Sequence, residues 1–406
     1  MSPPKLETKR KSWSEVNKTR KEEKKKWKEM NLMKKMEKEK LKEVVEKQKN
    51  VENSQVTAKP VSTLSIAVPG SILENAQSAE LRTYLAGQIA RAACIFQVDE
   101  IVVFDDFCDE ANAKKSTLED NDGVKVARQC CAQLGRILQY LECPQYLRKS
   151  FFPMHPDLKF SGLLNPLNAP HHLMAKDEFI FREGVVTNKP VKPGRGSLVN
   201  VGLLKDVQVD KLLEPGIRCT VRMLPQEAGS KKFKGVIVSP SIPRRETGVY
   251  WGYTVRIANS LSQVFSQCPY KDGYDLTLGT SDKGTSVDEF ECPTFKHSLV
   301  MFGGLQGLEA AVENDTLINV DDPKLLFDCY LNTLPQQGSK TIRTEEAILV
   351  SLAALRPKLN PETKPKEFSE KNCGYYTSMD TSVTGQSENI DNKKEAESEN
   401  DLSRFD

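Results

Sequence analysis

Apolar strands alternate with helical segments at both ends of the ordered part of this chain, and this rhythm constrains its fold more than any other feature. Thr63–Pro69 alternates as a strand does, and Glu100–Phe104 is a short continuous apolar run of the kind found in strands covered on both faces. Ser78 is a predicted cap for a helix between these strands, and residues 125–141 predict a second helix. Strand, helix, strand, helix indicates a parallel sheet with helical crossovers.

The rhythm breaks after residue 165 and resumes near residue 274. Between them lie short strand-like segments, FREGVV, KPGRGSLVNVG, GIRCTVRML, FKGVIVSP and YWGYTVRIA, at spacings near ten residues. Such spacing is typical of a small β-barrel or sandwich, and we expect an OB-like barrel. Strands are then predicted over residues 274–281, 298–304 and 326–333, with a helix over residues 344–355. The barrel is therefore predicted as an insertion in an α/β domain.

Five segments follow from these patterns. We expect a basic, charged helical arm over residues 1–58, the two parts of the α/β domain over 59–165 and 256–357, the barrel over 166–255, and a disordered acidic tail over 358–406. The net charge of +2 hides this asymmetry, which is typical of tails that meet an anionic partner.

The ten cysteines are scattered, with no pair at the two-residue spacing of a zinc or redox site. With no signal peptide, this usage predicts a reduced, intracellular compartment. The adjacent His171 and His172 are predicted to lie in a loop and not to form a metal site, so no metal is expected. No apolar run is long enough to span a membrane.

Three predicted strands in the C-terminal half end in loops of small residues. In parallel sheets ligands bind beyond the carboxyl ends of the strands, and glycines let main-chain groups approach them closely. One such loop alone is more often a tight turn, but three in order favour a nucleotide-like ligand. The predicted cofactor contacts are Gly279, Thr280, Lys283, Gly303, Gly304, Gly307, Asn332, Thr333, Gly338 and Ser339.

The class of ligand is narrowed by exclusion. Phe302 stands where the dinucleotide fingerprint has its first glycine, and Thr333 stands where a phosphate loop has a glycine five residues before Gly338. A ligand held mainly through adenine, ribose and a neutral tail remains, and S-adenosylmethionine fits that description.

Several long segments resemble one eukaryotic family. They are PGSILENAQSAELRTYLAGQIARA, QYLECPQYLRKSFFP, GLLNPLNAPHH, GVYWGYTVR, FGGLQGLE and QGSKTIRTEEAI, and they lie between residues 62 and 355. The chain is similar to the SPOUT-domain-containing methyltransferases, also described as centromere- and spindle-associated proteins.

The resemblance implies a trefoil-knotted α/β domain that forms a homodimer, with S-adenosylmethionine held by main-chain groups of three loops. It also implies N3-methylation of a uridine in large-subunit ribosomal RNA, and a link to spindle poles and kinetochores in mitosis. A nuclear, nucleolar and cytoplasmic location follows, extending to the spindle poles, centrosome and kinetochore in mitosis. Family members typically carry arginine where this chain has Lys283, which puts a specific guanidinium contact there in doubt.

N3 of uridine carries a proton, so the reaction needs a base, or donors and cations at the flanking carbonyls. Asn75 is the candidate for orienting the uracil edge, Arg343 for stabilising negative charge, and Glu345 for accepting the proton. Each has a plainer explanation, since Asn75 can simply stabilise its turn and Glu345 can complement the helix dipole after Thr344, the predicted N-cap.

Basic residues on the first helix and the barrel are the candidates for RNA contact, although those on the helix can equally be salt-bridge partners. They are Arg82, Arg91, Arg182, Arg195, Lys231, Lys232, Arg244 and Arg245. Phe181, Phe233 and Tyr250 are candidates for stacking bases.

Two other functions stay open at this point. One is a catalytically silent scaffold that uses the knotted fold for binding at the spindle or kinetochore. The other is an RNA-binding ribosome-assembly factor in which the cofactor is only structural. The three intact glycine loops favour the enzyme.

Overall fold

The computed structural model describes residues 62–107, 128–191, 194–225, 233–318, 320 and 322–359. All of them belong to one compact unit, Val61–Asp406. The predicted helical arm and almost all of the predicted acidic tail lie outside the described residues, so both stay predictions.

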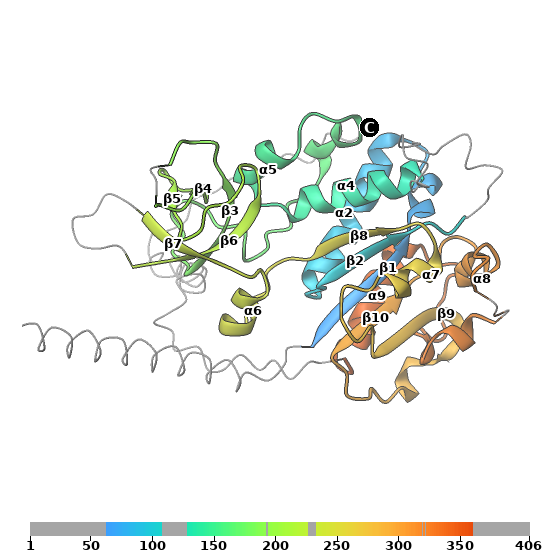
Figure 1. Ribbon diagram of the computed structural model, residues 1–406. Coiled ribbons are helices and arrows are strands. Elements are labelled where there is room, and N and C mark those ends of the chain that lie inside the picture. Colours follow the sequence, from blue (N-terminus) through green and yellow to red (C-terminus); the bar gives the residue numbers. More distant parts are fainter. Residues whose placement is uncertain are drawn as a thin grey trace, which may run out of the picture. The chain divides into compact units, whose positions relative to one another are not determined.

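A six-stranded sheet in which every neighbouring pair is parallel forms the centre of the α/β part (Figure 1). Its order is β11-β9-β10-β1-β2-β8. The strands are β1 (Thr63–Pro69), β2 (Glu100–Phe104), β8 (Thr254–Ala258), β9 (Leu276–Ser286), β10 (His297–Met301) and β11 (Cys329–Asn332).

Helices cover both faces of this sheet. Alternate strand residues face opposite ways, so Ile66 and Val68 pack under one set of helices and Ala67 under the other. The first set is α2 (Ala79–Ile95), α4 (Gln129–Glu142) and α9 (Thr344–Leu355). The second is α7 (Leu261–Ser266) and α8 (Gly307–Glu313).

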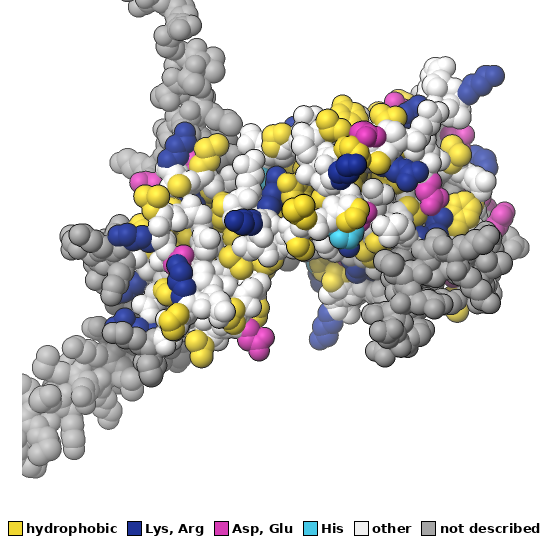
Figure 2. All heavy atoms as spheres, turned by 90° about the horizontal axis from the view of Figure 1, so that it is seen from above, with side chains coloured by type: hydrophobic (Ala, Val, Ile, Leu, Met, Phe, Trp, Pro, Cys, Tyr) yellow, Lys and Arg dark blue, Asp and Glu magenta, His cyan; other side chains and the backbone are white. Residues whose placement is uncertain are grey.

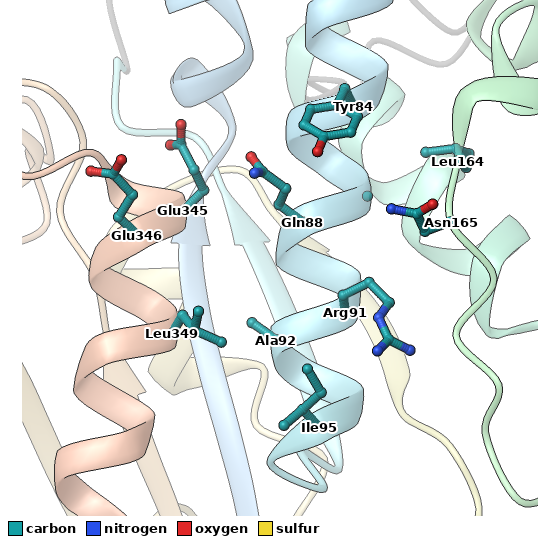
Figure 3. A pocket seen from close by; sticks show the side chains of 11 residues that line it. Tyr84, Gln88, Arg91, Ala92, Ile95, Leu164, Asn165, Glu345, Glu346 and Leu349 are labelled. Carbon is teal, nitrogen blue, oxygen red and sulfur yellow. The ribbon is translucent and has the colours of Figure 1, made fainter. Parts of the chain in front are cut away.

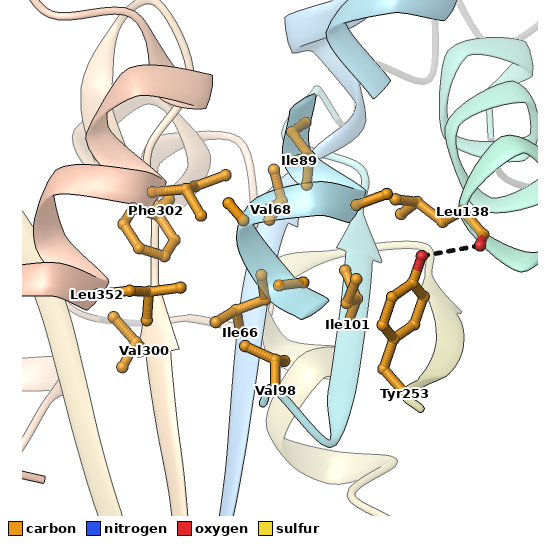
Figure 4. Close-up of a cluster of buried hydrophobic side chains, with 14 of the residues drawn as sticks. Ile66, Val68, Ile89, Val98, Ile101, Leu138, Tyr253, Val300, Phe302 and Leu352 are labelled. Atoms are coloured by element: carbon orange, nitrogen blue, oxygen red, sulfur yellow. Dashed lines mark hydrogen bonds between the residues drawn. The ribbon is translucent and has the colours of Figure 1, made fainter. Parts of the chain in front are cut away.

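The larger core lies between the sheet and the first set of helices (Figure 4). Ile66, Ile101 and Val300 from three neighbouring strands meet Ile89 of α2 and Leu352 of α9 there, each essentially inaccessible to solvent. The Tyr253 hydroxyl enters the same core and donates to the carbonyl oxygen of Leu138 at 2.9 Å, so its polar end is satisfied.

Shorter helices connect these elements. They are η1 (Gly70–Asn75), α5 (Gln145–Phe151), η2 (Pro156–Leu158), η3 (Ser161–Leu163), α6 (Ile242–Thr247), η4 (Val287–Glu289) and η5 (Pro323–Leu326). Within the described ranges, no helix has the length and apolar character needed to cross a bilayer.

The predicted barrel is confirmed as a closed, five-stranded one in the order β3-β4-β5-β7-β6. Its interior is filled mainly by valines, including Val199, Val207 and Val221, none of which is exposed. The strands are β3 (Phe181–Val186), β4 (Leu198–Asn200), β5 (Val207–Gln208), β6 (Arg218–Met223) and β7 (Phe233–Val238).

One barrel prediction is wrong. The segment YWGYTVRIA is not a barrel strand, because its second half is β8, which pairs in parallel with β2 at the edge of the large sheet. Its first half carries Tyr250 and Trp251, which are buried. A β-branched, aromatic run fits either sheet, so the pattern alone could not assign it.

A buried ionic network joins the barrel to the α/β part. Arg218 of β6 donates from Nη1 to Glu142 at the end of α4 at 2.6 Å, and from Nε to Glu183 of β3 at 2.9 Å. Nε2 of the fully buried His171 lies 3.0 Å from Glu142, and Trp251 donates to Glu183 at 2.6 Å. Because each carboxylate accepts from several donors, hydrogen bonding offsets the free-energy cost of burying these charges.

This network sets the charge state of Glu142. Burial alone would raise the pKa of its carboxyl group, but the hydrogen bond with His171 and the positive charge of Arg218 lower it from 4.5 to about 2. A group whose pKa is lowered by folding stabilises the protein above its unfolded-state pKa, and this contribution is lost as the pH falls toward the folded-state value.

We therefore expect E142Q to lower the free energy of unfolding by about 3 kcal/mol at pH 7, measured by urea denaturation. The difference from the wild type should shrink below about pH 4.5 and nearly vanish near pH 2. The matched control is E246Q, which removes an exposed ion pair with Arg222 and should cost less than about 1 kcal/mol. Equal stabilities of E142Q and E246Q would contradict this account.

Candidate active site

The sheet has a topological switch point between β1 and β10, where the connections from the two strands run to opposite sides. The chain leaves β1 through α2 to reach β2 on one side, and leaves β10 through α8 to reach β11 on the other. In open α/β sheets the carboxyl ends of the strands at such a switch point form the binding crevice. Here that edge carries Ser71 after β1 and the Gly303-Gly304 turn after β10.

The turn after β10 is too tightly packed for any residue but glycine. A Cβ on Gly303 would lie 2.6 Å from the carbonyl carbon of Gly307, and Gly307 itself has φ of +78°. The Gly307 amide donates to the Gly304 carbonyl at 3.1 Å, which closes the turn. The turn is therefore held in one conformation by its own backbone.

The first glycine segment differs from its prediction. Gly279, Thr280 and Lys283 do not lie in a loop after a strand, because β9 continues to Ser286. The pairing with β11 nevertheless jumps from Gly279–Tyr330 to Thr285–Leu331, so residues 280–284 bulge out of the ladder. The segment that was expected as a loop after a strand is therefore a bulge within β9.

Side chains connect the three segments. The Thr280 hydroxyl donates to the Met301 carbonyl at the end of β10 at 2.8 Å, and Nδ2 of Asn332 donates to the Asp282 carbonyl at 3.0 Å. Nζ of Lys283 lies 2.9 Å from Oε1 of Glu309. The sequence-predicted segments are thus brought together at one edge of the sheet.

The third segment begins at Asn332 and runs to α9. Oδ1 of Asn332 accepts from the Leu334 amide at 3.1 Å, the Thr333 and Ser351 hydroxyls are 2.6 Å apart, and the Ser339 hydroxyl donates to the Thr341 carbonyl at 2.7 Å. Gly338 has open space around it.

Thr344 was predicted as the N-cap of α9, and this prediction is wrong. Arg343 occupies the cap position, and its amide donates to the Glu346 carboxylate at 3.2 Å. The Thr344 hydroxyl instead donates to the Gly303 carbonyl at 3.1 Å, which ties the start of α9 to the second glycine turn.

The edge fits a nucleoside-like cofactor on two structural grounds. Gly303 and Gly304 carry no side chain at the carboxyl end of β10, where the Gly303 carbonyl accepts from the Thr344 hydroxyl, and the hydroxyl of Tyr330 on β11 is buried without a hydrogen-bond partner. A buried hydroxyl rarely stays unpaired unless a ligand or water completes it. Tyr330 was not among the residues predicted from the sequence, because an aromatic residue in a strand is usually part of the core.

The three catalytic candidates lie in different surroundings. Asn75 is exposed at the end of η1, and the side chain of Arg343 is 80% exposed. The Glu345 side chain is only 11% exposed and lines a pocket of about 300 Å³ between α2 and α9. In Figure 3 it faces Gln88 of α2.

The basic candidates separate into free and engaged side chains. Arg195 and Arg245 are exposed. Arg182 is buried and donates to the carbonyls of Val201, Met174 and Asp177, which leaves it unavailable to RNA in this structure.

The remaining basic candidates are engaged or undescribed. Arg244 is paired with Asp99, Arg82 donates to the Ala76 carbonyl at 3.3 Å, and Arg91 donates to the Leu167 carbonyl at 2.7 Å. Lys231 and Lys232 lie outside the described residues. On the face in Figure 2, Lys and Arg side chains are scattered among apolar and neutral surface and do not gather in one patch.

The candidates for base stacking are mostly unavailable. Phe181 and Tyr250 are buried, so neither presents a ring face to solvent, and Phe233 is half-buried. Among the residues that the structure describes, no group of His, Cys, Asp or Glu is arranged to hold a metal ion.

Comparison with known proteins gives one family. The family model described as "Putative RNA methyltransferase" matches residues 63–355, most of the chain. A relative named 28S rRNA (uridine-N(3))-methyltransferase from Drosophila melanogaster is 56% identical over 367 residues, 88% of this chain and 75% of its own. Relatives with that name from Mus musculus and Homo sapiens are 60% and 56% identical, covering 73% and 77% of this chain and 77% and 84% of theirs.

Replacing the glycine at the centre of the site tests its role. G303A places a methyl group against Gly307 and Leu308, so we expect at least tenfold weaker binding of S-adenosylhomocysteine in calorimetric titration. The matched control is G162A, where a Cβ meets nothing within 4 Å and affinity should stay within twofold. Unchanged affinity of folded G303A would show that the ligand binds elsewhere.

Proposed function

Since the chain belongs to this family of RNA methyltransferases, we propose that it transfers a methyl group from S-adenosylmethionine to N3 of a uridine in large-subunit ribosomal RNA. The observation that carries this proposal is the convergence of three backbone segments at the switch point between β1 and β10. The relatives' names supply the choice of base and RNA.

Bound S-adenosylmethionine supplies an electrophilic methyl group on a sulfonium. The chain's own contribution is positioning, which lowers the barrier of an in-line displacement. Main-chain groups of the Gly303-Gly304 turn, the Thr280–Lys283 bulge and the Asn332–Thr333 segment would hold the cofactor, with Gly338 and Ser339 beside them. The Tyr330 hydroxyl would donate to its polar groups.

The Lys283–Glu309 ion pair links the first two of these segments and is largely exposed. The carboxylate of the cofactor can compete with Glu309 for the ammonium group, because both are anions and the pair is open to solvent. Lys283 therefore keeps its proposed role as a cofactor contact.

Asn75 and Arg343 are proposed to contact the uracil. Both are exposed, Asn75 follows β1, and Arg343 precedes the threonine that holds Gly303. An amide can bind the edge of the base, and a guanidinium can stabilise negative charge on its carbonyl oxygens. Glu345 lines the pocket beside α2, so its predicted role as the proton acceptor is less favoured by the geometry than a carboxylate beside the glycine turn.

Arg195 and Arg245 are the proposed phosphate contacts, since their side chains are exposed. The predicted knot, the nucleolar location and the mitotic link to spindle poles and kinetochores stay predictions from the resemblance. The silent scaffold and the assembly factor are the alternatives, and both predict that no methyl group is transferred.

A second copy of the chain is the proposed partner of the α2–α9 face. Large apolar side chains are exposed along it, with Leu81 and Ile95 each 53% exposed and Tyr84 and Leu349 nearly as much. Tyr84, Ile95 and Leu349 also line the pocket of Figure 3. Exposed apolar patches of this kind mark association surfaces.

The function is tested by incubating purified protein with unmodified large-subunit ribosomal RNA and S-adenosylmethionine, then mapping nucleosides by mass spectrometry. N3-methyluridine should form with the wild type and fall at least tenfold with G303A, because a Cβ at that position clashes with the backbone of Gly307 and Leu308 and distorts the turn. Formation of no methylated nucleoside would contradict the enzyme and favour the scaffold.

The dimer is tested by charge insertion. L349E places a carboxylate in the apolar face, and light scattering should then give the mass of one chain where the wild type gives two. L325E alters an exposed leucine elsewhere and should leave the mass unchanged. A monomeric wild type would contradict this proposal.

A further inference from the structure

A serine and an aspartate meet at the switch point, directly beside the second glycine turn. Ser71 follows β1, Asp106 follows β2, and the Ser71 hydroxyl donates to Oδ2 of Asp106 at 2.5 Å. A Cβ on Gly304 would lie 3.1 Å from that oxygen and 3.2 Å from Oγ of Ser71. The pair therefore lies beside the Gly303-Gly304 turn, whose main-chain groups are proposed to hold the cofactor.

The backbone holds both members of the pair in place. Asp106 lies at the carboxyl end of a strand buried on both faces, and its carbonyl oxygen accepts from Nδ2 of Asn314 at 2.9 Å. Ser71 belongs to η1, the same short helix that ends at Asn75. A group that moves a proton must be fixed in this way relative to its substrate.

Two charged groups, Arg128 and Asp105, act on Asp106 among the residues that the structure describes. Nη2 of Arg128 lies 3.1 Å from Oδ1, while Nε of the same guanidinium lies 2.7 Å from Asp105 and Nη1 lies 3.4 Å from Glu74. Arg128 thus divides its charge among three carboxylates. Burial raises the pKa of Asp106, outweighing the hydrogen bond from Ser71 and the charge of Arg128, which lower it.

We propose that Ser71 and Asp106 form the proton-accepting pair of the methyl transfer, an inference that rests on the proposed function. As the bond between N3 and the methyl carbon forms and the carbon–sulfur bond breaks, the N3 proton passes to Oγ of Ser71. The Ser71 hydroxyl proton passes at the same time to Oδ2 of Asp106. The carboxylic acid later releases its proton to water, which restores the pair.

Other carboxylates fit this role less well. Glu345 lines the pocket on the α2–α9 face, and Asp105 is occupied by Arg128 and by the Phe107 amide, which donates to it at 3.1 Å. Asp106 alone of these three is joined to a hydroxyl that contacts the glycine turn.

The pair is tested by D106N in the full chain, which keeps the shape and the hydrogen bond from Ser71 but cannot accept a proton. We expect kcat for N3-methylation to fall at least 100-fold, while the Kd of S-adenosylhomocysteine and the KM for RNA stay within threefold. S71A should lower kcat in the same direction. The acid limb of the wild-type pH profile should be absent from the residual activity of D106N.

The matched control is D105N, which removes the neighbouring carboxylate and its bond to Arg128 but leaves the Ser71–Asp106 pair intact. Its kcat should stay within fivefold of the wild type. An equal loss of kcat in D105N and D106N would overturn the proposal, because the effect would then come from losing an ion pair with Arg128. Wild-type kcat in a D106N variant that binds cofactor would overturn it too. Absence of transfer by the wild type would instead overturn the proposed function.

Discussion

The parallel pairing of β1 with β10 is the interaction on which the rest of the structure depends. It joins Thr63 to His297 and Ala67 to Met301, residues far apart in the chain with the whole barrel between them. Such pairing carries a loop-closure cost that burial must offset, and the paired residues of Ser65–Ala67 and Leu299–Met301 are inaccessible to solvent. Because this pair of strands is also the switch point, the pairing that closes the fold also brings the predicted cofactor-binding segments to one edge of the sheet.

The barrel depends on a different interaction. Arg218 lies between Glu142 of the α/β part and Glu183 of the barrel, so one guanidinium pairs with a buried carboxylate of each part. Removing Arg218 would leave two buried carboxylates with one charge partner fewer, which is strongly destabilising.

Much of the fold followed from periodicity. The bounds of Thr63–Pro69, Glu100–Phe104 and Thr344–Leu355 were predicted as the structure has them, because buried strands and a strongly apolar helix leave few alternatives. The two-residue strand Val207–Gln208 and the true place of Thr254–Ala258 were missed, since both are decided by tertiary pairing. The family predicted from the quoted motifs is confirmed.

Side-chain roles were harder to predict than the segments that carry them. The glycine positions converge as expected, because backbone requirements are visible in a sequence. Arg182 reads as a surface cation but is buried among carbonyls, and Ser71 and Asp106 read as ordinary strand ends. Only the sheet order, which no local pattern contains, brings those two residues to Gly304.

A structure of the protein with S-adenosylhomocysteine tests the central claim most directly. The account predicts the ligand at the carboxyl edge of β9, β10 and β11, against the main chain of Gly303 and with its sulfur directed toward Ser71. A ligand seated in the pocket between α2 and α9, or a glycine turn closed against any ligand, would contradict it.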